Sequence, residues 1–213
     1  MQRINIGCGD QPTLGWRNFD NSLSLKVAKV PVLPSILINL GFFKEQASFI
    51  KYCKNYSIEY GDAVKGLPMQ SGCADVLYSS HMIEHLNQTE MRLFLKEARR
   101  VLISGGIIRL VVPDLLQLVQ DYLETKDADK FMTRCYVTEP LSRSFLRRIQ
   151  LLLVGARNHQ WMYDGLSLSC LLVSNGFTSP RVLKAGETQI QDPQNLDLFE
   201  RSSESVYVEA INP

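Results

Sequence analysis

The stretch INIGCGD, residues 4–10, decides the fold class of this chain. A short apolar strand at residues 3–6 runs directly into a turn that contains Gly7 and Gly9. Glycine at these positions permits positive φ and lets a ligand approach the backbone. Amide N–H groups exposed in such a turn favour an anionic ligand group, such as a carboxylate or a phosphate. The turn therefore predicts a ligand site at the end of the first strand.

An acidic residue, Asp20, ends the next expected strand, residues 16–20. A carboxylate there can accept hydrogen bonds from both hydroxyls of a ribose, and charged hydrogen bonds contribute about 1.5–3 kcal/mol each. A nicotinamide-binding turn would need a third glycine, where this chain has Thr13, and an acidic residue about twenty residues further on. The sequence has no G-x-x-x-x-G-K-[ST] motif, which excludes a P-loop.

Strand and helix patterns alternate along the rest of the chain. The clearest helix, residues 89–102, has one apolar face, Thr89 or Asn87 as its cap, and Gly105-Gly106 as its stop. This order predicts an α/β fold with a doubly wound, mostly parallel sheet, in a single domain over residues 1–213. The other expected helices are residues 44–55, 115–124 and 166–175, and the other expected strands are residues 57–60, 74–78, 107–112, 182–185 and 206–211.

Composition and charge exclude several classes of function. Lys and Arg number 23 against 22 Asp and Glu, so no overall positive field argues for nucleic acid as a partner. The five cysteines are an odd number without C-x-x-C, which argues against a disulfide framework and fits a reducing cytoplasm. No signal peptide is expected before residue 3, and the uncharged residues 30–43 are too short to span a bilayer. We expect a cytoplasmic protein.

Two segments fall outside the expected sheet, residues 22–43 and 127–163. The first is mostly apolar, and the second carries Arg143, Arg147 and Arg148 among apolar residues. We expect both to be insertions that cover the ligand crevice as lids. The arginine cluster is usually a solvated helix face, but it is also compatible with an amphipathic helix that contacts a membrane surface peripherally.

Several short motifs, taken in their order, resemble class I S-adenosylmethionine-dependent methyltransferases over nearly the whole chain. The motifs are INIGCG (4–9), GWRNFD (15–20), DA (62–63), GLP (66–68), ADVLYSSHMIEHL (74–86), RVL (100–102), GG (105–106) and VVPD (111–114). More narrowly, HQWMYD (159–164) and SVYVEA (205–210) resemble bacterial methyltransferases associated with surface-polysaccharide and glycosyl-transfer functions. The resemblance implies a Rossmann-like, seven-stranded methyltransferase sheet with helical cover segments, and S-adenosylmethionine as the cofactor.

Carried over residue by residue, the resemblance implies a cofactor site at the strand ends. The glycine turn would lie under the methionine part, Asp20 would hold the ribose, and Asp62 would accept from the adenine amino group. One departure is that only residues 11–15 separate the first two strands, so a turn replaces the usual helix. The expected cofactor-binding residues are Gly7, Cys8, Gly9, Asp20, Asn21, Asp62, Ala63, Ser79, Ser80 and His81.

The implied reaction is methyl transfer by in-line displacement to a small-molecule or glycan/lipid-linked acceptor. A general base is needed only for a poor nucleophile, such as a sugar hydroxyl. His81 is our catalytic candidate, because neutral imidazole accepts a proton near pH 7, and Tyr163 and His159 are second choices. The alternative function is a non-catalytic module that binds S-adenosylmethionine.

A third hypothesis is a zinc hydrolase, because His81, Glu84 and His85 match the inverted zinc-protease pattern H-x-x-E-H. Such a site needs a third ligand and an open coordination position. No motif places the remaining histidine, His159, so no metal is expected and His85 is interpreted as a histidine packed beneath the loop. Asp114 either caps the helix that follows it or faces the substrate.

Overall fold

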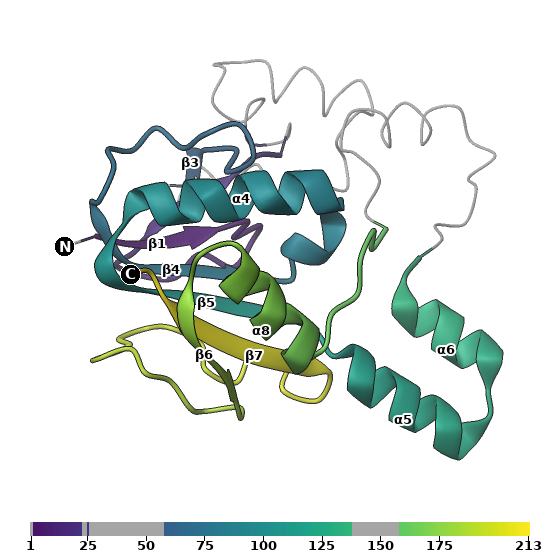
Figure 1. Ribbon diagram of the computed structural model, residues 1–213. Helices are drawn as coiled ribbons and strands as arrows, with labels where there is room; N and C mark the ends of the chain where they lie inside the picture. The colour runs from purple at the N-terminus through teal and green to yellow at the C-terminus, as the bar shows by residue number, and fades with distance from the viewer. Residues whose placement is uncertain (1, 23–24, 26–57, 138–157) are drawn as a thin grey trace, which may run out of the picture.

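Seven strands form one sheet in the computed structural model, which describes residues 2–22, 25, 58–137 and 158–213. The strand order is β3-β2-β1-β4-β5-β7-β6 (Figure 1). The pairs from β3 to β5 are parallel, whereas β7 runs antiparallel to both β5 and β6. This confirms the Rossmann-like α/β fold. The strands are β1 Gln2–Ile6, β2 Arg17–Asp20, β3 Ile58–Tyr60, β4 Ala74–Ser80, β5 Leu102–Pro113, β6 Thr178–Leu183 and β7 Ser205–Ile211.

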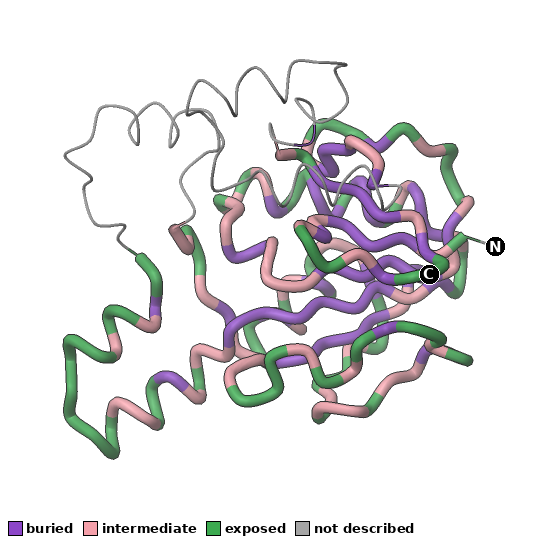
Figure 2. Tube along the Cα trace, turned by 180° about the vertical axis from the view of Figure 1, so that it is seen from behind, coloured by how far each residue is buried: buried purple, intermediate pink, exposed green. Residues whose placement is uncertain are grey.

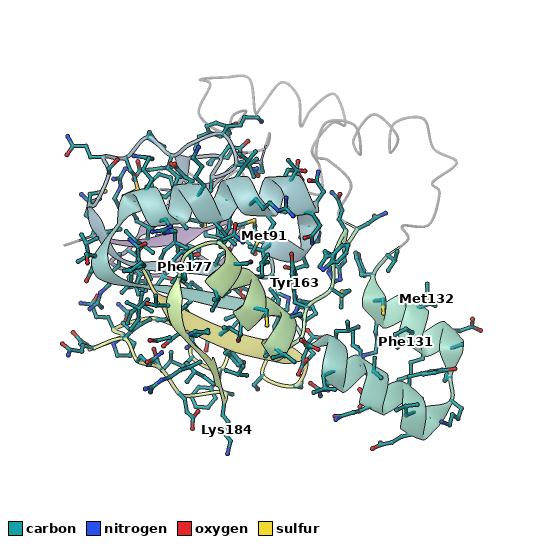
Figure 3. The ribbon with its side chains drawn as sticks, in the orientation of Figure 1. Met91, Phe131, Met132, Tyr163, Phe177 and Lys184 are labelled. Atoms are coloured by element: carbon teal, nitrogen blue, oxygen red, sulfur yellow. The ribbon has the colours of Figure 1, made fainter. Side chains whose placement is uncertain are left out.

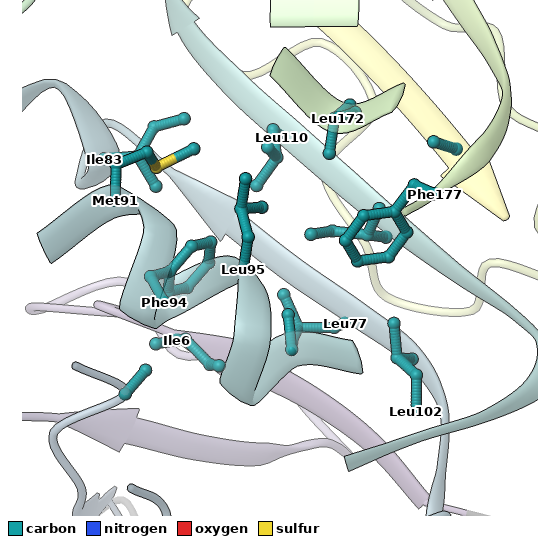
Figure 4. Packing of buried hydrophobic residues seen from close by; sticks show 14 of the residues in the cluster. Ile6, Leu77, Ile83, Met91, Phe94, Leu95, Leu102, Leu110, Leu172 and Phe177 are labelled. Atoms are coloured by element: carbon teal, nitrogen blue, oxygen red, sulfur yellow. The ribbon is translucent and has the colours of Figure 1, made fainter. Parts of the chain in front are cut away.

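Two helices, α4 (Gln88–Val101) and α8 (Gly165–Ser174), cover one face of the sheet (Figure 1). Their buried side chains join those of the strands in the main hydrophobic cluster (Figure 4). Asn87 caps α4 and forms a capping box with Glu90, which confirms one of the two expected caps. The central residues of this cluster include Ile6, Leu77, Phe94, Leu95, Leu110 and Leu172.

The opposite face is covered, among the described residues, by the irregular segment 184–204 rather than by a helix. Ile190 and Leu196 of this segment pack against Trp16, Tyr78 and Tyr207. Residues 7–16, between β1 and β2, contain no helix, as expected from their length. The segment 184–204 therefore supplies apolar cover to the face that such a helix would occupy.

Two further helices, α5 (Leu115–Thr125) and α6 (Ala128–Cys135), extend away from the sheet beyond the end of β5 (Figure 1). Figure 2 shows that they are largely exposed. Phe131 on α6 (Figure 3) contacts Tyr122 on α5, and their ring centroids are 5.4 Å apart. The Asp114 side chain accepts a 3.0 Å hydrogen bond from Leu116 N, so Asp114 caps α5.

Some element boundaries differ from the sequence expectations. The helix expected to stop at Gly105-Gly106 ends at Val101, because Leu102 already pairs with Ala74 in the sheet. The strand β6 begins at Thr178 rather than at residue 182, since its pairing with β7 sets its length and Pro180 is tolerated on an edge strand.

Other expectations concern residues that the structure does not describe. The helix at 44–55, nearly all of the cover segment 22–43, and the arginine cluster lie outside the described residues, as does the membrane contact inferred from that cluster. Among the helices that are described, none has the length and apolar character needed to cross a membrane.

Candidate functional site

The glycine turn after β1 is tied by hydrogen bonds to the end of β2. The amides of Gly7 and Cys8 both donate to the carbonyl oxygen of Phe19, at 2.8 and 3.2 Å. The amide of Gly9 donates to Oδ2 of Asp20 at 3.1 Å. The expectation that these amides are exposed to an anionic ligand is therefore wrong, because the neighbouring strand already uses them.

The Asp20 carboxylate is held in a fixed position, with 9% of the residue exposed. Its Oδ1 accepts a 2.8 Å hydrogen bond from Ser22 N, and its Oδ2 accepts from Gly9 N. A carboxylate has about four acceptor positions, so it can still accept further hydrogen bonds. Asn21 beside it is exposed. The ribose role expected for Asp20 stays a prediction, and these two hydrogen bonds leave room for it.

The two glycines of the turn differ in what surrounds the position of a Cβ atom. Gly7 has φ +72°, and a Cβ there would lie 2.4 Å from Cγ of Met82. Gly9 has φ +51°, and a Cβ there would meet nothing within 4 Å. Packing against Met82, which the sequence did not indicate, therefore requires glycine at position 7, whereas the space at Gly9 is open to a ligand.

Asp62 lies in the turn that follows β3, next to the end of β2. The amide of Gly61 donates to the carbonyl oxygen of Asp20 at 3.1 Å, which joins the two strand ends. The Asp62 side chain accepts from Val64 N at 3.1 Å and pairs with Lys65 Nζ at 2.8 Å. Ala63 is buried beneath this turn. Asp20 and Asp62 therefore lie at the ends of neighbouring strands.

The end of β4 completes the row of strand ends. Ser79 Oγ donates to the carbonyl oxygen of Ile6 at 2.9 Å, so its hydroxyl joins β4 to β1, while Ser80 is half-buried at the last position of β4. His81 follows with φ 47°, a left-handed conformation that histidine adopts more readily than most residues. Its amide donates to Val111 O at 2.9 Å and fixes the turn.

The His81 imidazole lies between a hydroxyl and a carboxylate. Its Nε2 is 2.9 Å from Ser205 Oγ, and its Nδ1 is 3.4 Å from Oε1 of Glu84. The carboxylate favours the tautomer with a proton on Nδ1, which leaves Nε2 as the basic nitrogen. Ser205 begins β7, and no sequence pattern indicated its contact with His81.

A cavity of about 420 Å³ lies beyond the ends of β4 and β5. Its wall is polar and apolar in about equal parts, with Pro113 and Leu118 among the apolar residues. Arg134 on this wall pairs with Asp121, and Arg201 pairs with Glu204 at 2.5 Å. His81 is the expected cofactor-site residue that lines this cavity, whereas the glycine turn, Asp20 and Asp62 do not. The polar lining residues include His81, Glu84, His85, Arg134, His159 and Arg201.

The segment 158–163 is attached to the 3₁₀ turn η1 (Ile83–His85) and brings His159 to this cavity. Gln160 N donates to the carbonyl oxygen of Glu84 at 2.8 Å, and Gln160 Nε2 donates to that of His85 at 2.9 Å. His159 Nε2 then lies 3.9 Å from Glu84 Oε1. Burial lowers the pKa of His159, which favours its neutral form.

The H-x-x-E-H motif is not built as in an inverted zinc protease. That pattern needs both histidines on one α-helical face, but His81 precedes η1, which is a three-residue 3₁₀ turn. His85 is half-buried and lines the cavity, with Nδ1 3.2 Å from Asn158 O. The hydrolase geometry is therefore contradicted, and the interpretation of His85 as merely packed beneath the loop is incomplete.

Tyr163, a second choice for the base, is 2% exposed. Burial raises its pKa to about 12, so the phenol remains protonated near neutral pH. Asp114 already uses its carboxylate to cap α5, and neither Asp114 nor Tyr163 is among the residues that line the cavity. Neither group is suited to accept a proton at the cavity.

Comparison with known proteins agrees with this arrangement. Residues 36–110 match a family model described as a methyltransferase domain, a region that contains Asp62 and the end of β4. A search of curated proteins found no match. Together with the fold, this match supports a methyltransferase.

Solved structures with the same fold include several methyltransferases. One is an S-adenosylmethionine-dependent methyltransferase of Thermotoga maritima, described as a possible histamine N-methyltransferase; it has 17% identity and a TM-score of 0.51, over 100% of this chain and 82% of that one. Another, from Archaeoglobus fulgidus, has 12% identity and a TM-score of 0.52, over 99% and 86%. PigF, solved with S-adenosylhomocysteine, has 12% identity and a TM-score of 0.50, over 100% of this chain and 50% of PigF. At these identities the likeness shows the fold alone.

Proposed function

We propose that this protein transfers the methyl group of S-adenosylmethionine to a hydroxyl group of a polar acceptor, either a small molecule or the glycan part of a lipid-linked molecule. The observation that carries the proposal is the position of His81. It ends the row of strand-end residues assigned to the cofactor, and it also lines the cavity beyond β4 and β5. One side chain thus lies between the cofactor region and a space for a second substrate.

The strand-end residues fit the cofactor in three respects. The space at Gly9 is open, Asp20 retains acceptor capacity for a ribose diol, and Asp62 lies at the neighbouring strand end. The cofactor supplies a methyl group that is already activated by a positively charged sulfur. The protein must therefore chiefly position the acceptor, an effect that can supply at most about 7–11 kcal/mol.

The cavity presents polar side chains to which a polar acceptor can bind. Its volume of about 420 Å³ is within the range of small-molecule sites, and histidine, arginine and glutamate side chains form much of its wall. Such side chains can hydrogen-bond several hydroxyl groups of a sugar-like molecule. The association with polysaccharide substrates that the motifs suggested fits this chemistry.

His81 would remove the proton from the acceptor hydroxyl. The basic nitrogen Nε2 is occupied by the Ser205 hydroxyl at 2.9 Å, and Glu84 faces the other nitrogen. The acceptor hydroxyl would therefore replace Ser205 at Nε2 or pass its proton through Ser205. Glu84 would stabilise the imidazolium that forms, because it is a buried carboxylate near Nδ1.

Calorimetry with S-adenosylhomocysteine, combined with methyl-transfer assays on monosaccharides and sugar nucleotides, tests the proposal. The wild-type protein should bind the cofactor product and methylate a hydroxyl acceptor. The His81→Gln variant should retain binding within about twofold but lose turnover by about 100-fold or more, the range of general-base catalysis. Ser205→Ala separates the two proton routes, because it should lose turnover only if the proton passes through Ser205.

The alternative function, a non-catalytic module that binds S-adenosylmethionine, makes a different prediction. It requires binding of S-adenosylhomocysteine without methyl transfer to any acceptor. It also requires that His81→Gln preserve the protein's biological role. Absence of binding by the wild-type protein would overturn both proposals.

A further inference from the structure

All three histidines of the chain gather around one buried carboxylate, that of Glu84. Glu84 is 1% exposed, and neither of its side-chain oxygens has a hydrogen-bond partner among the described residues. Burial of a carboxylate without partners is unfavourable unless a charge compensates it. The groups around Glu84 therefore leave the hydrogen-bonding capacity of its carboxylate unused.

The geometry of three of these residues is that of metal ligands. One ligand atom each from Glu84, His85 and His159 lies within 4.8 Å of the other two. The ring centroids of the two histidines are 5.1 Å apart, with the rings inclined at 63°. His81 does not belong to this group and lies against Glu84 Oε1 through its own Nδ1.

The contact that His85 makes through one ring nitrogen suits the other ring nitrogen for binding a metal ion. Its Nδ1 lies 3.2 Å from the carbonyl oxygen of Asn158, an acceptor that favours a proton on Nδ1. The lone pair is then on Nε2, and metal-binding histidines commonly have this second hydrogen bond to a carbonyl or carboxylate. The residue that supplies the carbonyl immediately precedes His159, so one backbone segment both orients His85 and provides the other histidine.

We propose that Glu84, His85 and His159 bind one divalent transition-metal ion, with Zn²⁺ or Mn²⁺ as the ions that imidazole and carboxylate ligands suit. All three residues line the cavity, so the remaining coordination positions face the space proposed for the acceptor. The two arginines on this wall are already paired with Asp121 and Glu204. No motif in the sequence supplied a third metal ligand, and in the structure His159 takes that place.

An ion at this position would bind an acceptor hydroxyl and lower its pKa, a role that rests on the proposed function. Binding of the ion itself does not depend on that function. Glu84 would then contact the ion and remain next to His81, which links the ion to the base.

Titration of the chelator-treated full chain with Zn²⁺ or Mn²⁺ by calorimetry tests the site. We expect one ion per chain and a higher melting temperature with the ion present. Glu84→Gln and His159→Gln should weaken binding at least 10-fold. Two controls should stay within twofold: Glu204→Gln, a carboxylate on the same wall, and Cys170→Ser, an exposed thiol. Equal binding by Glu84→Gln, or no binding by the wild type, overturns the proposal.

A second measurement needs no variant. Because the chain has three histidines, ¹⁵N-labelled imidazole resonances of the wild-type protein report each ring separately. Zn²⁺ should shift one ring nitrogen each of His85 and His159 as a ligand does, and should not do so for His81. A ligand-type shift at His81 alone, or at no ring, would rule the site out. Unchanged methyl transfer by the chelated protein would overturn the ion's role in the reaction but leave its binding intact.

Discussion

The backbone N–H of Gly9 donates a 3.1 Å hydrogen bond to Oδ2 of Asp20. This contact joins the glycine turn after β1 to the acid at the end of β2, the two features from which the cofactor site was inferred. Because Ser22 N holds the other oxygen at 2.8 Å, the carboxylate is oriented by the fold itself. Such preorganisation reduces the entropy that a ligand must lose on binding.

The first prediction concerns Asp20. Asp20→Ala should weaken binding of S-adenosylhomocysteine at least about 10-fold, because one charged hydrogen bond contributes about 1.5–3 kcal/mol. Asp20→Asn, which keeps one acceptor oxygen, should show a smaller loss. Calorimetry provides the measurement, and Asp10→Asn, an exposed acid in the same turn, is the control. Undiminished binding by Asp20→Ala would exclude this carboxylate from the site.

The second prediction compares the effects on stability of replacing Gly7 and Gly9. Gly7→Ala should destabilise the fold more than Gly9→Ala, because only the first Cβ would overlap Met82. Positive φ alone costs a non-glycine residue about 1–2 kcal/mol, which is the expected loss at Gly9. Urea unfolding measures both. Adding Met82→Ala to Gly7→Ala should recover part of the loss, and equal losses at the two glycines would contradict the packing argument.

The third prediction concerns a buried ion pair in the sheet. Arg109 and Glu209 are both 0% exposed, with Nη1 and Oε1 2.7 Å apart, and Thr188 and Gln189 N bind the same carboxylate. Glu209→Ala should cost about 3–5 kcal/mol in the free energy of unfolding, since it leaves the guanidinium buried without its partner. Urea unfolding again provides the measurement.

Two comparisons make this prediction specific. Glu59→Ala breaks the partly exposed pair of Glu59 with Arg17 and should cost at most about 1 kcal/mol. The double change Arg109→Met with Glu209→Leu should cost less than Glu209→Ala, because no unpaired charge remains. Equal losses for Glu59→Ala and Glu209→Ala would refute this account.

The fourth prediction is a pH dependence of stability. Hydrogen bonds from Arg100, supported by one from Leu67 N, hold the pKa of Glu97 below its ordinary value. A lowered folded-state pKa stabilises the fold above the unfolded pKa, and this stability is lost as the pH falls through the folded pKa. Glu97→Gln should therefore lower the melting temperature at pH 7, and the difference from wild type should shrink as the solution is acidified below about pH 4.

Thermal unfolding between pH 3 and pH 7 checks this dependence. The exposed Glu124→Gln on α5 is the control, and it should show no comparable pH-dependent difference. A difference between Glu97→Gln and wild type that stays constant over this range would mean that the carboxylate charge is not its cause.

The sequence predicted the strands and a mostly parallel sheet, which was enough to place the strand-end residues at one edge. Parallel strands bring their carboxyl ends to one edge, so Gly9, Asp20 and Asp62 were expected at the same edge. The order β3-β2-β1 in the structure makes them neighbours. The expected helix 89–102 and its cap at Asn87 also follow from local pattern and turn chemistry. The stop at Gly105-Gly106 failed because pairing of Leu102 with Ala74 extends β5.

What the sequence by itself determined is therefore the α/β class and the row of residues at the ends of the parallel strands, because periodicity and turn residues are encoded locally. Only the tertiary structure decided that Met82 packs on Gly7, that Ser205 contacts His81, and that His159 joins Glu84 and His85. These contacts depend on packing and backbone hydrogen bonds between elements, and for Ser205 and His159 the partners are far apart in the chain. No local pattern of residues specifies such contacts.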